Sequence, residues 1–424
     1  MFLAAVPPEL FAVFASHLPL HATPPTLLSL ALVNRGLSGI ALHLIHSCIV
    51  LKSEGDAAKM IQRLLEDVSL GRTVQELHIM YKPQSRDANG SSSGVVARLQ
   101  DVIDLGLLPN MHTLGIKLVR WSTRKLGKYA KLNLGFFRHL RLKCPRCKGL
   151  LLENTGDTSV DHWLDGTGLF DIDDLSCLSL GMVSVHEFGK LENSLGSLSS
   201  TLHTLAISKQ CDAISASRIF SLNFPVLRSL SLSEYTVDDT AEAMKFWNRH
   251  PSLEFIKCTV RELRGQSFFD NTYSPQFLPN LRHLKVQFSE VLTLARILHR
   301  LVSLEIHYSY NAQVPYLLQS VLPGGLPKLR SLFIYQQPSM RLRVVEDFDM
   351  ESILYETKEW KANGFAKNLK VQNMSMSDGY MPSIVRGAPN LEELGLQGSS
   401  KDFTSLSSFV RDIYWSIMSN MYLK

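Results

Sequence analysis

The chain has 424 residues, of which 45% are hydrophobic and 20% are charged, and its formal net charge is +5. This composition is ordinary for a soluble folded protein. No apolar run reaches the length of about 18 residues that a membrane-spanning helix requires. The first residues also lack the basic segment of a secretory signal. We therefore expect a cytoplasmic or nuclear protein without a membrane partner, whose cysteines are reduced thiols.

Residues 1–50 are expected to form a compact segment of three short helices. Pro7-Pro8-Glu9 is a favourable start, because proline fits the first turn and an acidic side chain interacts well with the helix dipole. Two further apolar helices are predicted around residues 27–33 and 37–45. So small a segment cannot bury all of its large apolar side chains by itself. Some of them are therefore predicted to contact the repeats that follow or another protein.

From residue 51 onward a short apolar phrase, Leu-x-x-Leu-x-Leu, recurs. Each copy predicts a short strand, because its last two apolar residues are two apart and point to the same face. Most copies are spaced by about 20–29 residues, which is the period of leucine-rich repeats. The twelve central residues are Leu77, Leu114, Leu140, Leu178, Leu205, Leu230, Ile256, Leu284, Leu304, Leu332, Leu369 and Leu394.

Helices are expected after several strands, for example at residues 241–247 and 292–298, and a proline stands two residues before many of the phrases. Because proline cannot continue a helix, we expect it to end each helix where the next strand begins. The pattern predicts an α/β fold in which residues 51–424 form a leucine-rich-repeat solenoid, a curved parallel sheet backed by helices. Residues 83–94 are expected to form a loop, and residues 403–424 either a terminal helical cap or an incomplete unit.

The residues between the buried positions of each strand point to the open side of the sheet. Aromatic side chains exposed on a concave surface favour contact with another protein. The residues predicted to bind a target protein there are Lys117, Arg141, Lys143, Phe255, Lys257, His283, Lys285, Glu305, His307, Phe333 and Tyr335.

Charge is distributed unevenly along the chain. Residues 105–152 contain eleven Lys or Arg and no acidic residue, whereas residues 153–187 contain eight acidic residues and no Lys or Arg. The basic block suits an acidic or phosphorylated segment, nucleic-acid phosphates, or the acidic block beside it in the stack. We favour pairing between the two blocks, because no nucleic-acid recognition motif accompanies the charge.

No motif for catalysis or cofactor binding is found. Glycine-rich phosphate-binding motifs and Gly-x-Ser-x-Gly are absent from the sequence. Cys144-Pro145-Arg146-Cys147 is the only Cys-x-x-Cys pair, whereas a structural zinc site takes four ligands and usually two such pairs. We therefore expect a plain loop there, no metal or cofactor, no catalytic residue, and a binding protein rather than an enzyme.

Residues 1–50 resemble an F-box. The resemblance rests on Pro7-Pro8-Glu9-Leu10, on Leu27-Leu28-Ser29-Leu30-Ala31-Leu32-Val33, and on Arg35 followed by Ala41-x-x-Leu44. With the repeats that follow, the chain is similar to F-box/leucine-rich-repeat proteins, particularly the divergent fungal-type ones. It departs from the family pattern in the long proline-rich link of residues 19–26 and in Leu37, where many members have an aromatic residue.

The resemblance implies a substrate-recognition subunit of an SCF-type cullin–RING E3 ubiquitin ligase. The F-box would bind a Skp-type adaptor, and through it a cullin, while the repeats would bind an unidentified target protein. The implied adaptor-binding residues are Pro8, Leu10, Phe14, Leu28, Leu32 and Val33.

Three alternatives stay open at this point. The same apolar residues would also serve simply to pack the three helices together. A non-catalytic scaffold with a degenerate F-box and no ligase role is the second alternative. A repeat-type regulator of a small GTPase is the third reading, and Arg120 and Arg124 are its candidates for a catalytic arginine.

Overall fold

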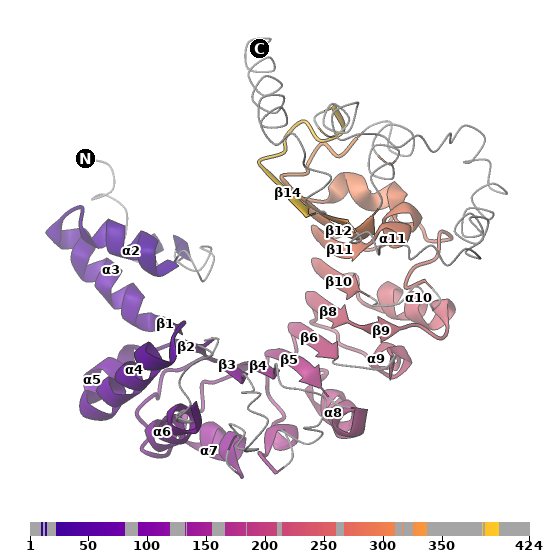
Figure 1. Ribbon diagram of the computed structural model, residues 1–424. Helices are drawn as coiled ribbons and strands as arrows, with labels where there is room; N and C mark the ends of the chain where they lie inside the picture. The colour runs from indigo at the N-terminus through magenta and orange to yellow at the C-terminus, as the bar shows by residue number, and fades with distance from the viewer. Residues whose placement is uncertain are drawn as a thin grey trace, which may run out of the picture. The chain divides into compact units, whose positions relative to one another are not determined.

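The structure is a computed structural model that describes residues 10–11, 13–14, 23–80, 92–118, 132, 134–154, 166–183, 185–209, 214–259, 267–309, 317, 325–336, 384 and 386–397. The chain divides into two compact units, Met1–Thr236 and Val237–Lys424. In each unit parallel strands follow one another in chain order, and helices lie along one face of the sheet (Figure 1).

Within its described residues, the first unit contributes seven strands to the larger sheet, in the order β1-β2-β3-β4-β5-β6-β8. Two short strands, β7 (Ile214–Ser215) and β9 (Tyr235–Thr236), form a separate parallel pair. The bounds of the seven are β1 Cys48–Leu51, β2 Glu76–Ile79, β3 Thr113–Leu118, β4 Gly149–Asn154, β5 Cys177–Val183, β6 Thr204–Lys209 and β8 Ser229–Ser233.

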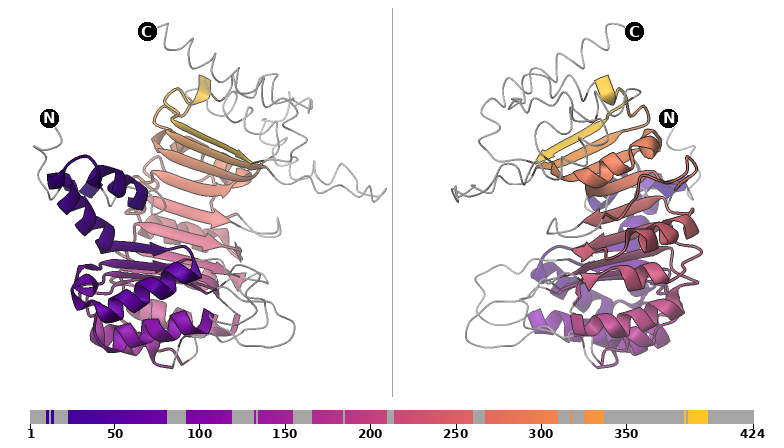
Figure 2. Two further views of the ribbon diagram at one scale, coloured as in Figure 1. Left: turned by 60° about the vertical axis from the view of Figure 1, so that its left-hand side comes forward. Right: turned by 90° about the vertical axis from the view of Figure 1, so that its right-hand side faces the viewer.

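The helices of the first unit form two groups. An antiparallel pair, α2 (Thr23–Ala31) and α3 (Arg35–Ser47), precedes β1, and α3 is in contact with the row of helices behind the strands (Figures 1 and 2). The row consists of α4 Glu54–Glu66, α5 Val68–Thr73, α6 Ser92–Asp104, α7 Phe136–Lys143, the 3-10 helix η2 Leu169–Asp171, α8 Val185–Leu198 and α9 Ser217–Ser221.

The second unit repeats the arrangement with five parallel strands, again counted over its described residues. The predicted helix at residues 241–247 is confirmed as α10 (Thr240–Arg249), and residues 292–298 span the end of α11 (Phe288–Thr293) and the 3-10 helix η3 (Ala295–Arg300). The strands are β10 Phe255–Thr259, β11 His283–Gln287, β12 Ser303–Ser309, β13 Ser331–Gln336 and β14 Glu393–Gln397.

The strands pair in one register, so the apolar centres of the repeats form columns. The column of the second unit passes through Ile256, Leu284, Leu304, Leu332 and Leu394. From Leu77 to Leu332 the column residues of both units are at most 2% exposed. The predicted parallel α/β arrangement is therefore confirmed. The column of the first unit is Ile49, Leu77, Leu114, Leu150, Leu178, Leu205 and Leu230.

The predicted strand centred on Leu140 is wrong, because this residue lies in α7. Phe136, Phe137 and Leu140 are buried at helical spacing, whereas Leu142, which a strand would bury with Leu140, is 77% exposed. The strand of this repeat is β4, which is centred on Leu150.

The remaining predictions concern the ends of the strand array and the segments outside the described residues. Strand β1 was not predicted, and it adds a repeat before the one centred on Leu77. The phrase at Leu369 and the segment 403–424 lie outside the described residues, as does most of the predicted loop, while Ser92 already begins α6. Of the three predicted N-terminal helices, α2 and α3 are described, and Leu10 and Phe14 are helical. The domain boundary at residue 50 stays a prediction.

The recurrent proline occupies a tight turn directly before the strand. In the turn of Pro279, for example, Leu281 N donates to Leu278 O at 3.1 Å. Proline suits the second position of such a turn because its φ is already fixed. The proline therefore shapes the turn that leads into the strand. This role is narrower than the expected one of ending the preceding helix. The same hydrogen bond closes the turns of Pro109, Pro225, Pro251, Pro327 and Pro389.

Asparagine follows the proline in three of these turns, and its side chain connects successive repeats. The Nδ2 of Asn110 donates to Arg72 O at 2.7 Å, and that of Asn280 donates to Pro251 O at 3.1 Å. In the same way Asn390 donates to a carbonyl of the preceding turn, at 2.7 Å. The turns thus satisfy backbone acceptors that the helix and strand bonds leave over.

Helix α11 carries a buried carboxylate. Glu290 is 5% exposed and accepts hydrogen bonds from Ser267 Oγ at 2.6 Å and Phe268 N at 2.8 Å. These bonds attach the segment before β11 to the helix that follows it. Burial raises the pKa of Glu290 from 4.5 to about 7, because the charged form loses its hydration.

Leu230→Asp is expected to lower the free energy of unfolding by about 4 kcal/mol or more, because it removes a buried leucine and inserts an unpaired charge. Ser231→Asp is the matched control, since the next residue of β8 points away from the column and is only half-buried. Urea unfolding followed by circular dichroism measures both variants. Equal losses from the two substitutions would contradict the register.

Glu290 also makes stability depend on pH. Its raised pKa means that the folded state binds the proton more tightly than the unfolded state, so its contribution is greatest below pH 4.5. The contribution should fall by about 3 kcal/mol as the pH rises to 7, at about 1.4 kcal/mol per pKa unit. Relative to Glu290→Gln, the wild type should lose unfolding free energy across this window. A pH-independent difference between the two proteins would contradict the assignment.

Candidate functional site

The N-terminal helices have a small core of their own. Phe11, Leu27, Leu37 and Leu44 are buried together, with three partly buried apolar side chains packed at the edge. The side chain of Asn34 caps α3 by accepting a hydrogen bond from Leu37 N at 2.9 Å, which fixes the turn between the two helices. The core thus holds the helix pair together with few residues.

Many apolar side chains of this segment stay outside that core. Of the eleven large apolar side chains that are exposed among the described residues, seven fall between residues 10 and 42. Scattered exposed apolar residues are normal, but a concentration of this kind is typical of a binding surface. We call five of them the N-terminal apolar residues: Leu10, Phe14, Leu28, Leu32 and Val33, which are 43–80% exposed.

The N-terminal apolar residues are five of the six that were predicted to bind an adaptor, and Pro8 lies outside the described residues. Among the described residues, they lie outside the buried core formed by Phe11, Leu27, Leu37 and Leu44. The ring of Phe14 makes an edge-to-face contact with that of Phe11, at a centroid distance of 6.3 Å.

A second surface lies on the open face of the second unit, the face opposite the buried column. The predicted residues on β10 to β13 alternate with the buried ones, and none of them is buried. Side by side on this face are the residues at three register positions: Phe255 and His283; Lys257, Lys285, Glu305 and Phe333; His307 and Tyr335.

Four residues of this face form what we call the open-face cluster: Lys285, Glu305, His307 and Tyr335. Glu305 forms ion pairs with Lys285 and with His307 Nε2, the latter at 2.9 Å. The His307 ring stacks on Tyr335 with the centroids 4.6 Å apart, and Lys285 Nζ lies 5.7 Å from the Tyr335 centroid. These contacts fix the side chains in one arrangement.

The cluster keeps Glu305 charged. Burial raises the pKa of this carboxyl group, but the hydrogen bonds and charges of His307 and Lys285 outweigh burial and hold it at about 2. Burial and the nearby Glu305 raise the pKa of Tyr335, which therefore stays a phenol. The face thus presents aromatic rings beside charges that are partly neutralised.

Two residues of the basic block do not lie on the open face. Arg141 and Lys143 were predicted on the open face, and this is wrong because both belong to α7. Lys117 is on the open face of β3 and pairs with Glu153 of β4 at 2.7 Å.

The favoured pairing of the basic with the acidic block is confirmed for the described residues. Arg138 pairs with Asp171 at 2.6 Å, and Arg141 pairs with Asp173. Together with the pair of Lys117, these contacts neutralise part of the charge that would otherwise attract an anionic ligand.

Two groups bear on metal binding. Cys144 and Cys147 flank a turn after α7, as predicted, and burial raises the pKa of each thiol to about 12. Among the described residues, the only set of three or more potential ligands consists of Cys48, Glu76 and His78. Sequence reasoning missed this set because it depends on the pairing of β1, which was not predicted, with β2.

Comparison with known proteins leaves the function to be argued from these surfaces. No protein-family model matches the chain, and a search of curated proteins finds no significant match. Over the described residues, none of the helices combines the length and the apolar character needed to cross a bilayer.

Glu305 should make stability depend on pH in the sense opposite to Glu290. Its depressed pKa gives a contribution that is fully present above pH 4.5 and is lost as the pH falls towards 2. The unfolding free energy of the wild type should therefore exceed that of Glu305→Gln at pH 7, and the two should converge in acid. Thermal or urea unfolding at several pH values measures the difference. Convergence on raising the pH instead would contradict the cluster.

Proposed function

We propose that this chain is the substrate-recognition subunit of an SCF-type cullin–RING E3 ubiquitin ligase. Its N-terminal helices bind a Skp-type adaptor, and the open face of its repeats binds the target protein. The observation that carries the proposal is the exposure of the N-terminal apolar residues, which are the positions that the F-box resemblance marks for adaptor contact.

The chemistry of these residues suits a permanent partner. Burial of one leucine, valine or phenylalanine side chain is worth about 1.5–3 kcal/mol, so five of them offer ample driving force for association. Leu28 and Leu32 are one helical turn apart, and the backbone of Leu32 is bonded to that of Leu28 at 3.2 Å. They therefore sit on one side of the end of α2, next to Val33, where one partner surface can cover them.

The open face of the second unit supports the second half of the proposal. Aromatic side chains are enriched in protein interfaces, and charged side chains beside them favour a partner of complementary charge. Phe255, Phe333 and Tyr335 supply the rings, and Lys257 and Lys285 supply the cations. The ion pairs of Glu305 hold Lys285 and His307 in place, so less side-chain entropy is lost when a target binds.

Adaptor binding is tested with the full chain and a purified Skp-type adaptor. The double variant Leu32→Asp/Val33→Asp is expected to weaken binding by about 100-fold or more, because two charges would enter an apolar interface. Calorimetric titration or co-purification measures the change. Stability should shift by only about 0.5 kcal/mol, because both side chains are exposed.

Leu142→Asp is the matched control, since Leu142 is equally exposed but belongs to α7. It should bind the adaptor as the wild type does. If the wild type does not bind the adaptor, the chain is instead a repeat scaffold with a degenerate F-box. Equal binding by the double variant and the wild type would show that the adaptor contacts other residues.

A further inference from the structure

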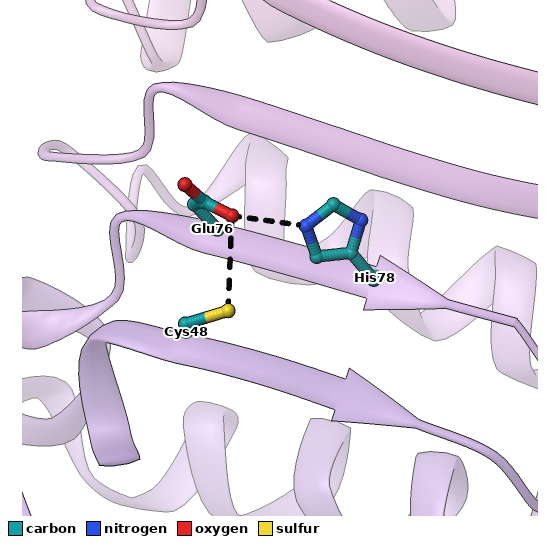
Figure 3. Close-up of side chains that lie close together, drawn as sticks. All are labelled: Cys48, Glu76 and His78. Carbon is teal, nitrogen blue, oxygen red and sulfur yellow. Dashed lines mark hydrogen bonds and ion pairs between the residues drawn. The ribbon is translucent and has the colours of Figure 1, made fainter. Parts of the chain in front are cut away.

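Cys48, Glu76 and His78 gather on the open side of the first two strands (Figure 3). Cys48 is the first residue of β1 and is the register partner of Glu76, the first residue of β2. His78 follows two residues later and so points to the same side as Glu76. Glu76 Oε2 lies 3.7 Å from Cys48 Sγ and 3.2 Å from His78 Nε2, and the three ligand atoms all lie within 4.8 Å of one another.

We propose that these three side chains bind a zinc ion. Zinc takes sulfur, nitrogen and oxygen ligands in a tetrahedron, at about 2.3 Å from sulfur and about 2.0–2.2 Å from nitrogen and oxygen. Such a tetrahedron places nitrogen and oxygen ligands about 3.3 Å apart, and sulfur and oxygen ligands about 3.6 Å apart. The two separations that involve Glu76 Oε2 already match these values, and the third, between Cys48 Sγ and His78 Nε2, is no more than 4.8 Å.

The imidazole is held by its surroundings. His78 is 2% exposed, and a Cβ at its register partner Gly115 would lie 2.5 Å from His78 Nδ1. The missing side chain at this glycine makes room for the ring beside β3. Nε2 is the ring nitrogen that faces the other two ligands, since it lies 3.2 Å from Glu76 Oε2, whereas Nδ1 has no hydrogen-bond partner among the described residues. A ring fixed in this way loses little freedom when it binds a metal.

Solvent reaches the site from one side. The Glu76 side chain is 43% exposed, so an ion can enter past it and water can supply the fourth ligand. A carboxylate, an imidazole and a thiol also match the borderline preference of zinc better than that of calcium or magnesium, which take oxygen ligands.

The ion would join the helical segment to the repeats. Cys48 caps α3, with its N–H bonded to Leu44 O, and it also begins β1. A metal bridge from Cys48 to β2 therefore fixes the end of the helix that belongs to the N-terminal core. This site does not depend on the proposed ligase role, and its test uses no adaptor.

The test uses the full chain, reduced and freed of metal with a chelator, and cobalt(II) as the spectroscopic probe. The wild type should bind one cobalt ion per chain with a thiolate-to-cobalt charge-transfer band and the strong visible bands of tetrahedral cobalt, and zinc should displace it. Cys48→Ser should lose the thiolate band and weaken zinc binding by about 100-fold or more, and Glu76→Gln should weaken it by about 10-fold or more.

Cys177→Ser is the matched control, because Cys177 is the first residue of β5 but its register partners are Gly149 and Thr204, which offer no comparable ligands. Cys147→Ser controls for the Cys-x-x-Cys pair. Both should bind cobalt as the wild type does. The proposal is overturned if the wild type shows no thiolate–cobalt band, if Cys48→Ser keeps it, or if either control loses it.

A second measurement separates a structural effect from a binding effect. Zinc should slow hydrogen exchange of the amides in β1 and the last turn of α3 in the wild type, and should leave them unchanged in Cys48→Ser. Equal protection in both proteins would mean that zinc acts elsewhere on the chain, which also overturns the proposal.

Discussion

Burial of the leucine columns is the constraint on which the rest of the structure depends. A single repeat of one strand and one helix cannot cover its own apolar residues, so each repeat needs a neighbouring repeat on either side. The backbone follows the same repeat: at the start of β11, the N–H groups of Arg282 and His283 both donate to Glu254 O, at 2.9 and 3.0 Å. The columns and helices occupy one face of the sheet. The other face therefore carries polar and aromatic residues that differ from strand to strand, and these are available to bind a partner.

Sequence periodicity predicted most of the strands that follow a proline turn, but it missed β4, which the turn of Pro145 precedes with the same kind of hydrogen bond, from Cys147 N to Cys144 O at 2.9 Å. Between Pro279 and β11, for example, the turn, the leucines and the strand all agree. The prediction failed at Leu140, because Leu140 and Leu142 are two residues apart, as in a strand, while Phe136 and Phe137 complete a helical face that the phrase ignores. The true strand, β4, is apolar at three successive residues and so shows no alternation to detect.

Sites differ in how far sequence can reach them. The open-face residues follow from alternation alone, so the sequence suffices to place Glu305, His307 and Tyr335 on this face. Their ion pairs and stacking required the register of β11, β12 and β13. Glu290 gave no sequence signal, because its burial comes from the segment around Ser267, which reaches it from 23 residues away. Likewise Cys48 and Glu76 become neighbours only through strand pairing over 28 residues.

The N-terminal helices and the repeats differ in how they are stabilised. The core around the helix pair consists of four buried apolar side chains, one of which, Phe11, precedes α2, whereas each strand of the array adds residues to a continuous column. A helix pair with so small a core gains little stability by itself. Any partner that binds only its folded form therefore stabilises it through mass action. Leu28, Leu32 and Val33 lie near the turn between the two helices, whereas Cys48 follows the other end of α3, so a protein partner and a metal ion would act on opposite ends of this pair.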